Sequence, residues 1–436
     1  MTVDHRAKQE LHFWDSIAIN IGIVIGVGIF RVPSEVAKYI HSELLILAAW
    51  ALGGVFTLLG VLCYAELSSR LPKTGGTYIY LRESFGKTVG FLFAWTDFAI
   101  LRTASIAALA YIFSDYLGTL VPFSAGYSKA VAIIVIGIFT IINIAGLHWA
   151  AGVQRWLTFL KVLSVLVMTG LIFGFARSQS MPLVGAGPAA GETTTPLFKF
   201  AAAMIPVLWV YGGWHESTFL AGEFRDTKRA LPISLIVGVL AVAVLYLVIN
   251  AAYLQVLTPH ELAQSDAVAS ETFGRRFGNA GQVIVTVAIL ISACGALNST
   301  ILTGARIPYA VAKDVPRLNR FSNVSERFGT PHASLLLIAM WSIALVVWGS
   351  FEQLLFFSGF AFWLFLSLVG LSVFRIRQET QGCEHFSMLG YPVVPVLFAI
   401  GCCCLCLVTI QHSPHQALVG TILILMGLPL YGLLRK

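Results

Sequence analysis

The sequence predicts an all-α membrane protein that crosses the bilayer many times. Of its 436 residues, 57% are apolar and only 11% are charged, and the mean hydropathy is +0.82. Such a composition does not describe a water-soluble globule of this length. The apolar runs are each long enough for a helix, and none shows the ten-residue alternation of a transmembrane barrel. Two of the runs, in corresponding places of the two halves, are interrupted by glycines.

The boundaries of the spans follow from the charged and Pro- or Gly-rich breaks between apolar runs. A helix needs about 20 residues to cross the hydrocarbon core, and twelve runs near that length can be recognised, of which the third is long and the ninth short. An even number of spans places both termini on one side. The predicted spans are residues 14–39, 44–66, 88–118, 129–147, 152–175, 197–222, 231–255, 281–306, 333–349, 354–374, 391–410 and 416–434.

The distribution of cationic residues predicts the orientation. Of 28 Lys and Arg residues, 19 fall in loops on the side of the termini, 4 fall in the opposite loops and 5 lie inside or at the ends of spans. Because cytoplasmic loops carry an excess of Lys and Arg, both termini are predicted to be cytoplasmic. The net charge of +7 is thereby explained by topology. A nucleic-acid-binding role lacks the basic stripe with interleaved aromatics that it needs.

Enzyme and metal chemistry find no support in the sequence. Gly-x-Ser-x-Gly, His-Glu-x-x-His and Walker-type motifs are absent, so we expect neither an enzyme nor an ATP-driven pump, and no cofactor. Four of the seven cysteines cluster at residues 402–406, where helical geometry points them in different directions. We therefore expect no metal site and no structural disulfide. Residues 1–13 are polar and the next run is too long for a signal peptide, so the first helix should be retained.

Glycines interrupt the first and sixth predicted spans near the bilayer centre, at residues 22–28 and 211–214. Hydrocarbon offers no hydrogen-bond partners, so such breaks persist only where the freed backbone groups face a cavity or a ligand. Paired breaks of this kind are the best sequence pointer to a transporter's substrate site. Gly22 and Gly26 also satisfy the G-x-x-x-G packing pattern. We assign packing to Gly22 and the site to the other glycines of the two breaks.

The two breaks offer complementary chemistry. The outer half of the first broken helix would present unpaired N–H groups and the positive end of its dipole, which form an anion site without a cationic side chain. The first half of the sixth span would end near residues 209–211 and present unpaired carbonyls, which suit an ammonium group. A carboxylate site beside an ammonium site describes a zwitterionic amino acid.

Several motifs resemble a known family. The string Gly-Ile-Val-Ile-Gly-Val-Gly-Ile-Phe at 22–30, the Glu-Leu-Ser-Ser-Arg-Leu-Pro loop at 66–72 with its Gly-Gly-Thr-Tyr continuation, and Tyr-Gly-Gly-Trp at 211–214 look like the amino acid-polyamine-organocation superfamily. Ile-Leu-Arg102, and Val-Gln at 153–154 followed by Lys161, narrow the resemblance to the L-type amino acid transporter family, as a bacterial member. The resemblance covers essentially the whole chain.

The resemblance implies a LeuT-like fold of 12 transmembrane helices, with a 5+5 inverted repeat and discontinuous helices 1 and 6. Residues 1–175 would hold the N-terminal tail and the first repeat, residues 176–380 the second repeat with its preceding outer loop, and residues 381–436 two peripheral helices. Transport would proceed by alternating access around a fixed central site.

The resemblance also implies the substrate-binding residues. An aromatic side chain at the position of Trp209 closes over the substrate in this family. The sequence departs from the family at Val27, where a serine is usual, and at Thr103, where proline commonly follows the arginine; without the hydroxyl, the backbone site at Val27 remains. Carried over by motif, the carboxylate would be held by Ile25, Gly26, Val27 and Gly28, and the amine and gate would be formed by Trp209, Val210, Tyr211, Gly212 and Gly213.

Lys161 lies nine residues into the fifth span, where a charged side chain costs about 3 kcal/mol and is a functional candidate by default. By resemblance it reaches between spans one and eight, where sodium binds in sodium-coupled relatives, and would support sodium-independent operation. A structural lysine satisfied by helix-end carbonyls is the alternative, and proton coupling stays open. Its possible neighbours in span eight are Ser292, Asn298 and Ser299.

Other polar residues near the predicted membrane core give weaker signals. Asp97 and Arg102 are five residues apart in span three, so we expect no direct pair between them. His215 and Glu216 follow the sixth-span break on its inner half, and His215 could shape the pocket or simply pack. An inner gate of ion pairs is predicted on the cytoplasmic side from Arg70, Lys73, Glu223, Arg225 and Asp226.

The sequence thus predicts a secondary active transporter of the plasma (inner) membrane that exchanges small or medium neutral L-amino acids without sodium. Trp209 and Trp214 beside Val27 and Val210 suggest a compact apolar pocket. The alternatives are a proton-coupled permease for cationic amino acids or polyamines and, in another class, an amino-acid-sensing receptor or channel on the same scaffold. The loop between spans three and four lacks the cysteine by which eukaryotic light chains join a glycoprotein, so we expect a monomer without a disulfide-linked heavy chain.

Overall fold

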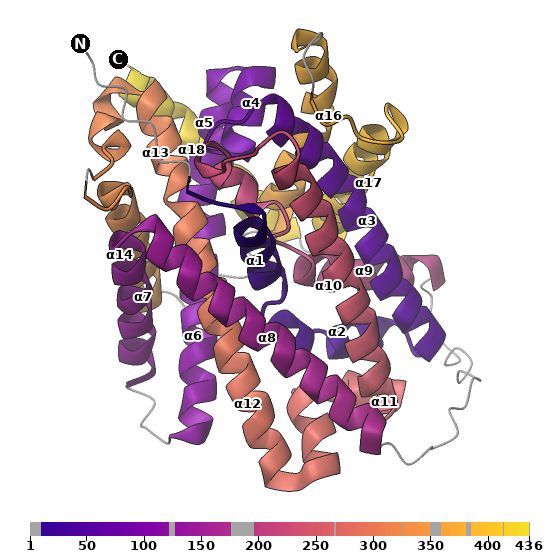
Figure 1. Cartoon of the computed structure of the whole chain (residues 1–436). Coiled ribbons are helices and arrows are strands. Elements are labelled where there is room, and N and C mark those ends of the chain that lie inside the picture. The colour runs from indigo at the N-terminus through magenta and orange to yellow at the C-terminus, as the bar shows by residue number, and fades with distance from the viewer. Residues whose placement is uncertain are drawn as a thin grey trace.

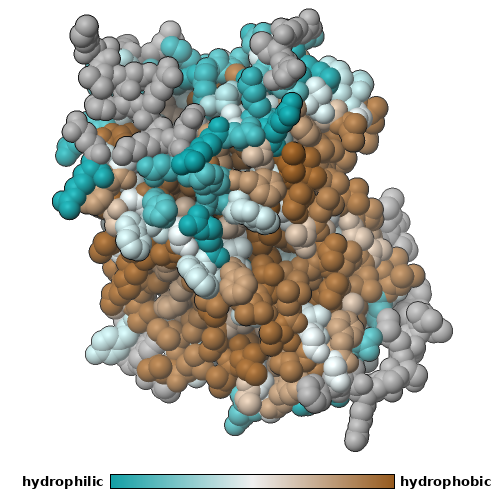
Figure 2. All heavy atoms as spheres, viewed as in Figure 1, coloured by the Kyte–Doolittle hydropathy of each residue, from teal (hydrophilic) through white to brown (hydrophobic). Residues whose placement is uncertain are grey.

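The computed structural model describes residues 10–121, 127–175, 196–265, 267–325, 327–348, 359–380, 385–412 and 414–435. Within these ranges the secondary structure is helical, apart from one isolated parallel β-bridge between Leu11 and Phe224. The long helices form a single bundle (Figure 1). Apolar residues cover the middle of the face shown in Figure 2, and hydrophilic residues gather over its upper end.

Eight helical stretches of the described chain are long and apolar enough to cross a membrane. The chain is therefore a polytopic helical membrane protein. These stretches are α3 (Glu43–Arg70), α5 to α6 (Lys87–Leu120), α8 (Leu147–Phe175), α10 (Ala230–Leu254), α12 to α13 (Val268–Asp314), α16 (Gly359–Glu379), α17 (Val393–His412) and α18 (Pro414–Arg435). Four further apolar helices are shorter: α1 (Phe13–Val24), α7 (Ser128–Ile144), α9 (Pro196–Val210) and α14 (His332–Trp348).

The described helices lie where the spans were predicted. The tenth predicted span begins at residues 354–358, which lie outside the described residues, as does the predicted outer loop at 176–195. The smaller elements are η1 (Gly28–Phe30), α2 (Pro33–Tyr39), α4 (Thr77–Phe85), η2 (Asp97–Arg102), η4 (Glu216–Glu223), α11 (Pro259–Gln264) and η5 (Pro316–Ser322); α12 and α13 (Arg306–Asp314) meet at residue 305.

The first and sixth predicted spans are both discontinuous. The first consists of α1, an irregular stretch at 25–27, the short η1 and then α2. The sixth consists of α9, a turn at 211–215 and η4. The turn contains Gly213 with φ +96°, a conformation that glycine alone adopts at little cost. Glycine at this position therefore allows the turn between α9 and η4.

The discontinuous first span lies at the centre of the bundle. In Figure 1, α1 occupies the middle, with α8 and α10 beside it. Contacts between elements show α1 packed on α8, α10 and α12, and α2 packed on α9 and α11. Each half of the first span thus has its own set of neighbours, and the break between the halves lies inside the protein.

Candidate functional site

The two breaks lie against each other. A Cβ atom placed on Gly213 would come within 2.2 Å of Ile23 Cγ2, and one placed on Gly28 within 2.9 Å of Val210 Cγ2 and 3.1 Å of Trp209 Cζ3. Such distances are shorter than ordinary Cβ contacts, so these two glycines let the breaks of the first and sixth spans pack closely together. The sequence showed only that these breaks lie at corresponding positions of the two halves of the chain. The fold brings them into contact.

Backbone groups at both breaks have no partner among the described residues. The N–H groups of Val27, Gly28 and Ile29 make no hydrogen bond there, and the carbonyls of Tyr211 and Gly212 accept none. Buried backbone groups are almost always paired. Three adjacent donors on one segment and two adjacent acceptors on the other are therefore available to a ligand.

The Cβ positions of Gly26 and Gly212 face backbone atoms rather than side chains. A Cβ atom on Gly26 would meet only the carbonyl oxygens of Ile23 and Val24, at 3.5 and 3.9 Å. A Cβ atom on Gly212 would meet only the backbone of Trp209, at 3.0 and 4.0 Å. Gly22 differs, because its Cβ would lie 1.9 Å from Gln154 Nε2. Gly22 is thus closely packed against α8, whereas no described side chain lies within 4 Å of the Cβ positions of Gly26 and Gly212.

Side chains from three helices satisfy carbonyls near the break in the first span. Lys161 of α8 donates to the Gly22 carbonyl oxygen at 2.6 Å, Tyr246 of α10 to Val24 at 2.5 Å and Ser292 of α12 to Ile25 at 2.9 Å. These bonds hold the broken segment in place. Tyr246 also donates to the carbonyl of Val210 at 3.3 Å, so one hydroxyl group joins both breaks. Tyr246 was not among the predicted site residues, although a phenol group in an apolar span needs a hydrogen-bond partner and so indicates a buried polar contact.

The Lys161 ammonium group lies between α1 and α12. The residue is 1% exposed, and a Cβ on Gly295 of α12 would lie 3.2 Å from its Nζ atom. Asn298, in contrast, is engaged elsewhere: its amide donates to Gln154 Oε1 at 2.9 Å, and its Oδ1 accepts from Asn143 at 3.0 Å. Of the three residues expected near Lys161, Ser292 lies at the break, and the contacts of Asn298 join α12 to α7 and α8 instead.

The remaining predicted site residues differ in exposure. Trp209 is 44% exposed, whereas Tyr211 is buried and donates its hydroxyl to the Trp50 carbonyl at 3.0 Å. The Ser299 hydroxyl is buried without a partner among the described residues. The ring of His215 is buried, and its Nδ1 atom likewise has no described partner. The rings around His215 are those of Tyr64, Trp214, Phe219 and Phe362.

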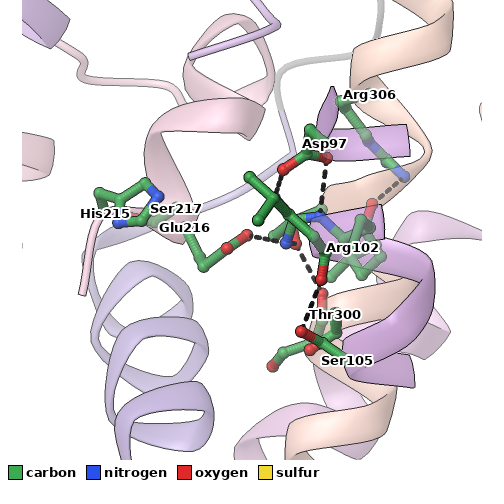
Figure 3. Close-up of polar contacts among 12 residues, drawn as sticks. Asp97, Arg102, Ser105, His215, Glu216, Ser217, Thr300 and Arg306 are labelled. Carbon is green, nitrogen blue, oxygen red and sulfur yellow. Dashed lines mark hydrogen bonds and ion pairs between the residues drawn. The ribbon is translucent and has the colours of Figure 1, made fainter. Parts of the chain in front are cut away.

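Arg102 forms buried ion pairs with two carboxylates, one of which was not expected to pair with it. Its guanidinium group lies 2.6 Å from Glu216 Oε2 and 3.2 Å from Asp97 Oδ2 (Figure 3). The expectation that Asp97 and Arg102 would not pair was wrong because η2 is a π-helical turn. Its hydrogen bonds join residues five apart, so side chains at that spacing come together. The Thr103 hydroxyl likewise donates to the Phe98 carbonyl, five residues back.

The predicted inner gate is also wrong in its pairing. Glu223 receives two hydrogen bonds from Arg306, at 2.9 and 2.8 Å. Arg70 pairs with Glu66 at 2.8 Å and Lys73 with Glu83 at 3.2 Å, rather than with the acidic residues that follow η4. The cation that pairs with Glu223 is Arg306, at the start of α13. The prediction that several charged residues lie on one side of the membrane could not identify this partner.

The inner halves of the two broken spans are joined. The Leu11 N–H donates to the Glu223 carbonyl at 3.0 Å, and the Arg225 N–H donates to the Leu11 carbonyl at 3.1 Å. Nearer the breaks, the Ser217 N–H donates to Asn20 Oδ1 at 3.1 Å. Helices α1 and η4 therefore form one hydrogen-bonded unit, which we call the inner unit.

Comparison with known proteins identifies the family. The amino acid permease family matches residues 11–433. The chain belongs to this family. It is 29% identical to the serine/threonine exchanger SteT of Bacillus subtilis (strain 168), over 100% of the chain and 99% of that protein. It is 30% identical to the human b(0,+)-type amino acid transporter 1, over 98% of the chain and 88% of that protein.

A further relative is the human Asc-type amino acid transporter 1, at 27% identity over 98% of the chain and 82% of that protein. The resemblance to the amino acid-polyamine-organocation superfamily and its L-type branch is therefore confirmed. The permease is an amino acid transporter embedded in a membrane, and not an enzyme.

Proposed function

We propose that the permease exchanges small or medium neutral L-amino acids across the plasma membrane, without sodium, by alternating access. The observation that supports this most directly is the meeting of the two breaks, with N–H groups on one and carbonyls on the other that are unpaired among the described residues. The substrate carboxylate accepts from the N–H groups of Val27, Gly28 and Ile29, where the dipole of the following half-helix adds to the attraction. The predicted set was 25–28, but the N–H groups of Ile25 and Gly26 already donate to backbone carbonyls, at 2.9 and 2.7 Å. The ammonium group donates to the carbonyls at 211–212. Only groups common to all α-amino acids are bound this way.

We further propose the LeuT-like arrangement: twelve spans, inverted repeats within residues 1–175 and 176–380, two peripheral spans within 381–436, and both termini cytoplasmic. The two interrupted spans support it, because paired broken helices at the repeat interface characterise this class of transporter. The inner unit then moves against the rest of the bundle to open the site to the cytoplasm, and Trp209 closes the opposite side.

The position of Lys161 supports sodium independence. Its ammonium group donates to the Gly22 carbonyl at 2.6 Å and lies beside Gly295 of α12. A carbonyl at a helix break is the kind of oxygen that a transporter offers to Na⁺. A fixed ammonium group satisfies that oxygen and repels a cation. The permease therefore needs no sodium ion to hold α1 against α12.

The pairing of Glu216 favours neutral over cationic substrates. Glu216 is the acidic residue next to the sixth-span break, and its carboxylate already receives a hydrogen bond from Arg102 at 2.6 Å. It is therefore engaged and does not serve as the counter-ion of a lysine, arginine or polyamine substrate. The name of the bacterial relative, a serine/threonine exchanger, agrees with small neutral substrates.

The test is uptake of labelled serine into proteoliposomes, either empty or preloaded with unlabelled serine, while sodium and the pH gradient are varied independently. We expect uptake that needs internal amino acid and is unchanged when choline replaces sodium. Unlabelled alanine and threonine should compete, whereas arginine and putrescine should not. Uptake into empty vesicles driven by an inward proton gradient would identify a proton symporter instead. Saturable binding without flux would identify a sensor.

Subunit composition is tested on the same preparation. We propose that the permease works as a monomer without a disulfide-linked heavy chain. Light scattering of the detergent-solubilised protein should give the mass of one chain after subtraction of bound detergent, and exchange should be unchanged by reducing agents.

A further inference from the structure

The guanidinium group of Arg102 is shared by two carboxylates inside the bundle. It donates to Glu216 Oε2 at 2.6 Å, to Asp97 Oδ2 at 3.2 Å and to Asp97 Oδ1 at 3.4 Å. The side chains of Arg102, Asp97 and Glu216 are 5%, 7% and 8% exposed. The hydroxyl of Thr303 accepts from the same guanidinium at 3.2 Å, and the ring of Phe219 lies 5.1 Å from its central carbon. The cluster is therefore almost completely buried in the protein.

The formal charges in this cluster do not balance. Two carboxylates face one guanidinium, which leaves one negative charge in excess if all three groups are ionised. A buried charge without a partner is strongly unfavourable, and two carboxylates that share a site do not readily both ionise. Among the described residues, no other lysine or arginine forms an ion pair with Asp97 or Glu216.

The neighbouring elements do not supply the missing positive charge. Arg306 of α13 is bound on two arms by Glu223, and Arg155 of α8 pairs with Asp15 of α1. Lys161 donates to a backbone carbonyl at the break. On α3 the facing titratable group is Tyr64, whose hydroxyl bonds to Thr77 at 2.7 Å. Within the described residues, none of these groups forms an ion pair with Asp97 or Glu216.

His215 is the remaining titratable neighbour of Glu216. Its ring is enclosed by the aromatic rings of Tyr64, Trp214 and Phe219, and its Nδ1 atom has no described hydrogen-bond partner. In Figure 3 the Glu216 side chain extends toward Arg102, while His215 lies on the other side of the chain. An imidazolium in this aromatic enclosure would be a second unpaired charge rather than a counter-ion.

We propose that Asp97 and Glu216 together bind one proton, so that Arg102, one carboxylate and one carboxylic acid form a neutral cluster. The proton is shared by the two carboxyl groups, because either of them can be ionised and form the ion pair with the Arg102 guanidinium group. Binding converts one carboxylate and a proton from water into a carboxylic acid, and nothing else changes. This site is independent of which amino acid the permease carries and of whether it exchanges or cotransports.

The position of the proton links it to the conformation of the inner unit. Glu216 begins η4, whereas Asp97 and Arg102 are on the third span. If η4 moves away, Asp97 keeps Arg102 as a balanced pair and Glu216 ionises against water, which releases the proton. The docked inner unit therefore binds one more proton than the released one, and acidification stabilises the docked state by linkage.

Infrared spectroscopy of the full-length protein in lipid nanodiscs tests the proposal. A carboxylic acid has a carbonyl band, distinct from that of carboxylates, that shifts when H₂O is replaced by D₂O. The variants Asp97→Asn and Glu216→Gln each leave Arg102 with one carboxylate, so each retains a balanced pair and should fold. We expect the wild type to show one such band and each of the two variants to lack it. Asp115→Asn, which changes an exposed carboxyl group on α6, is the matched control and should leave that band in place.

Each outcome decides the matter. Loss of the band in both variants supports a shared proton. Persistence of the band in both variants, or its absence from the wild type, overturns the proposal. Loss in only one variant shows that one carboxyl group holds the proton regardless of the other, and this also overturns the sharing. In proteoliposomes the dependence of transport on pH should be lost in both variants, whereas Asp115→Asn should keep the wild-type profile.

Discussion

Replacing Gly26 by alanine tests whether the break in the first span binds substrate. The added methyl group would meet only backbone oxygens, the nearest at 3.5 Å, which is an ordinary van der Waals distance. We therefore expect the free energy of unfolding to change by less than about 0.5 kcal/mol. The same methyl group points into the space that the proposal assigns to the substrate carboxylate.

The size of the effect follows from the hydrogen bonds at stake. A hydrogen bond to a charged group contributes about 1.5–3 kcal/mol, and each 1.4 kcal/mol is a factor of ten in affinity. If the methyl group displaces the carboxylate from one backbone N–H, the concentration of serine at half-maximal exchange should rise about 10-fold to 100-fold. The measurement is the concentration dependence of exchange in proteoliposomes, together with thermal unfolding in detergent.

Two other glycines provide matched controls. Gly137 on α7 has no described atom of another segment within 4 Å of its Cβ position, so Gly137→Ala should leave exchange unchanged and raise stability by about 0.5–1 kcal/mol through helix propensity. Gly213 has φ +96°, and its Cβ would lie 2.2 Å from Ile23. Gly213→Ala should therefore lose about 2–4 kcal/mol of stability through overpacking and backbone strain. Unchanged half-saturation in Gly26→Ala, with stability also unchanged, would refute the assignment of this break to the carboxylate.

Three further predictions concern stability. Tyr246→Phe removes the hydroxyl that serves both breaks and should cost about 1–3 kcal/mol in thermal unfolding, with slower exchange. Glu223→Gln leaves Arg306 buried beside a neutral partner and should cost about 3–5 kcal/mol, measured as a lower melting temperature. In the outer segment, hydrogen bonding to Arg275 and within the first turn of α11 lowers the pKa of Glu261 to about 2. Because the unfolded pKa is about 4.3, its stabilisation is present above that pH and is lost as the pH falls toward about 2. The difference in melting temperature between wild type and Glu261→Gln should therefore shrink over that range.

The first two of these substitutions have matched controls. Tyr253 lies on α10 with Tyr246, but its buried hydroxyl has no partner among the described residues, so Tyr253→Phe should not destabilise. Glu379 pairs with Arg375 on an exposed helix face, where the two side chains are 51% and 60% exposed, so Glu379→Gln should cost at most about 1 kcal/mol. Equal losses in Tyr253→Phe and Tyr246→Phe would contradict the role of the shared hydroxyl. A Glu261 contribution that grew on acidification would contradict the sign of its pKa shift.

Helix positions and breaks were predictable from the sequence because the bilayer imposes simple rules on it. Apolar runs of about 20 residues mark helices, and glycines in the middle of such runs mark the breaks at 25–27 and 211–215. The π-helical turn at 97–102 has no such mark, because it contains neither glycine nor proline. The Asp97–Arg102 contact was therefore missed, since the ordinary helical period keeps residues five apart on different faces.

Contacts between helices were the least predictable part of the site. The charge of Lys161 in an apolar span stood out, but nothing in the sequence identified the Gly22 carbonyl as its acceptor. The partner of Glu223 depended on where α13 begins, and several cations share its side of the membrane. Side-chain pairing between distant segments is set by packing, which one sequence does not display.

Among the described residues, three ion pairs tie the inner unit to the rest of the bundle, and they are not equivalent. Asp15 on α1 pairs with Arg155, and Glu223 on η4 pairs with Arg306. If the inner unit moved, the buried Arg306 would be left without the partner shown here, whereas Arg155 is 44% exposed and can turn to water.

The third pair, Arg102 with Glu216, is different because Arg102 has a second carboxylate on its own helix. Release of Glu216 leaves Arg102 bound to Asp97, so no buried cation is stranded, and the cost moves to Glu216, which is carried with η4. If the site opens toward the cytoplasm, the Arg102–Glu216 pair should therefore break first. The Arg306–Glu223 pair should either hold α13 and η4 together while both move, or break last. Cross-linking α13 to η4 with a cysteine pair distinguishes these two outcomes: exchange persists if the elements move together and stops if they must separate.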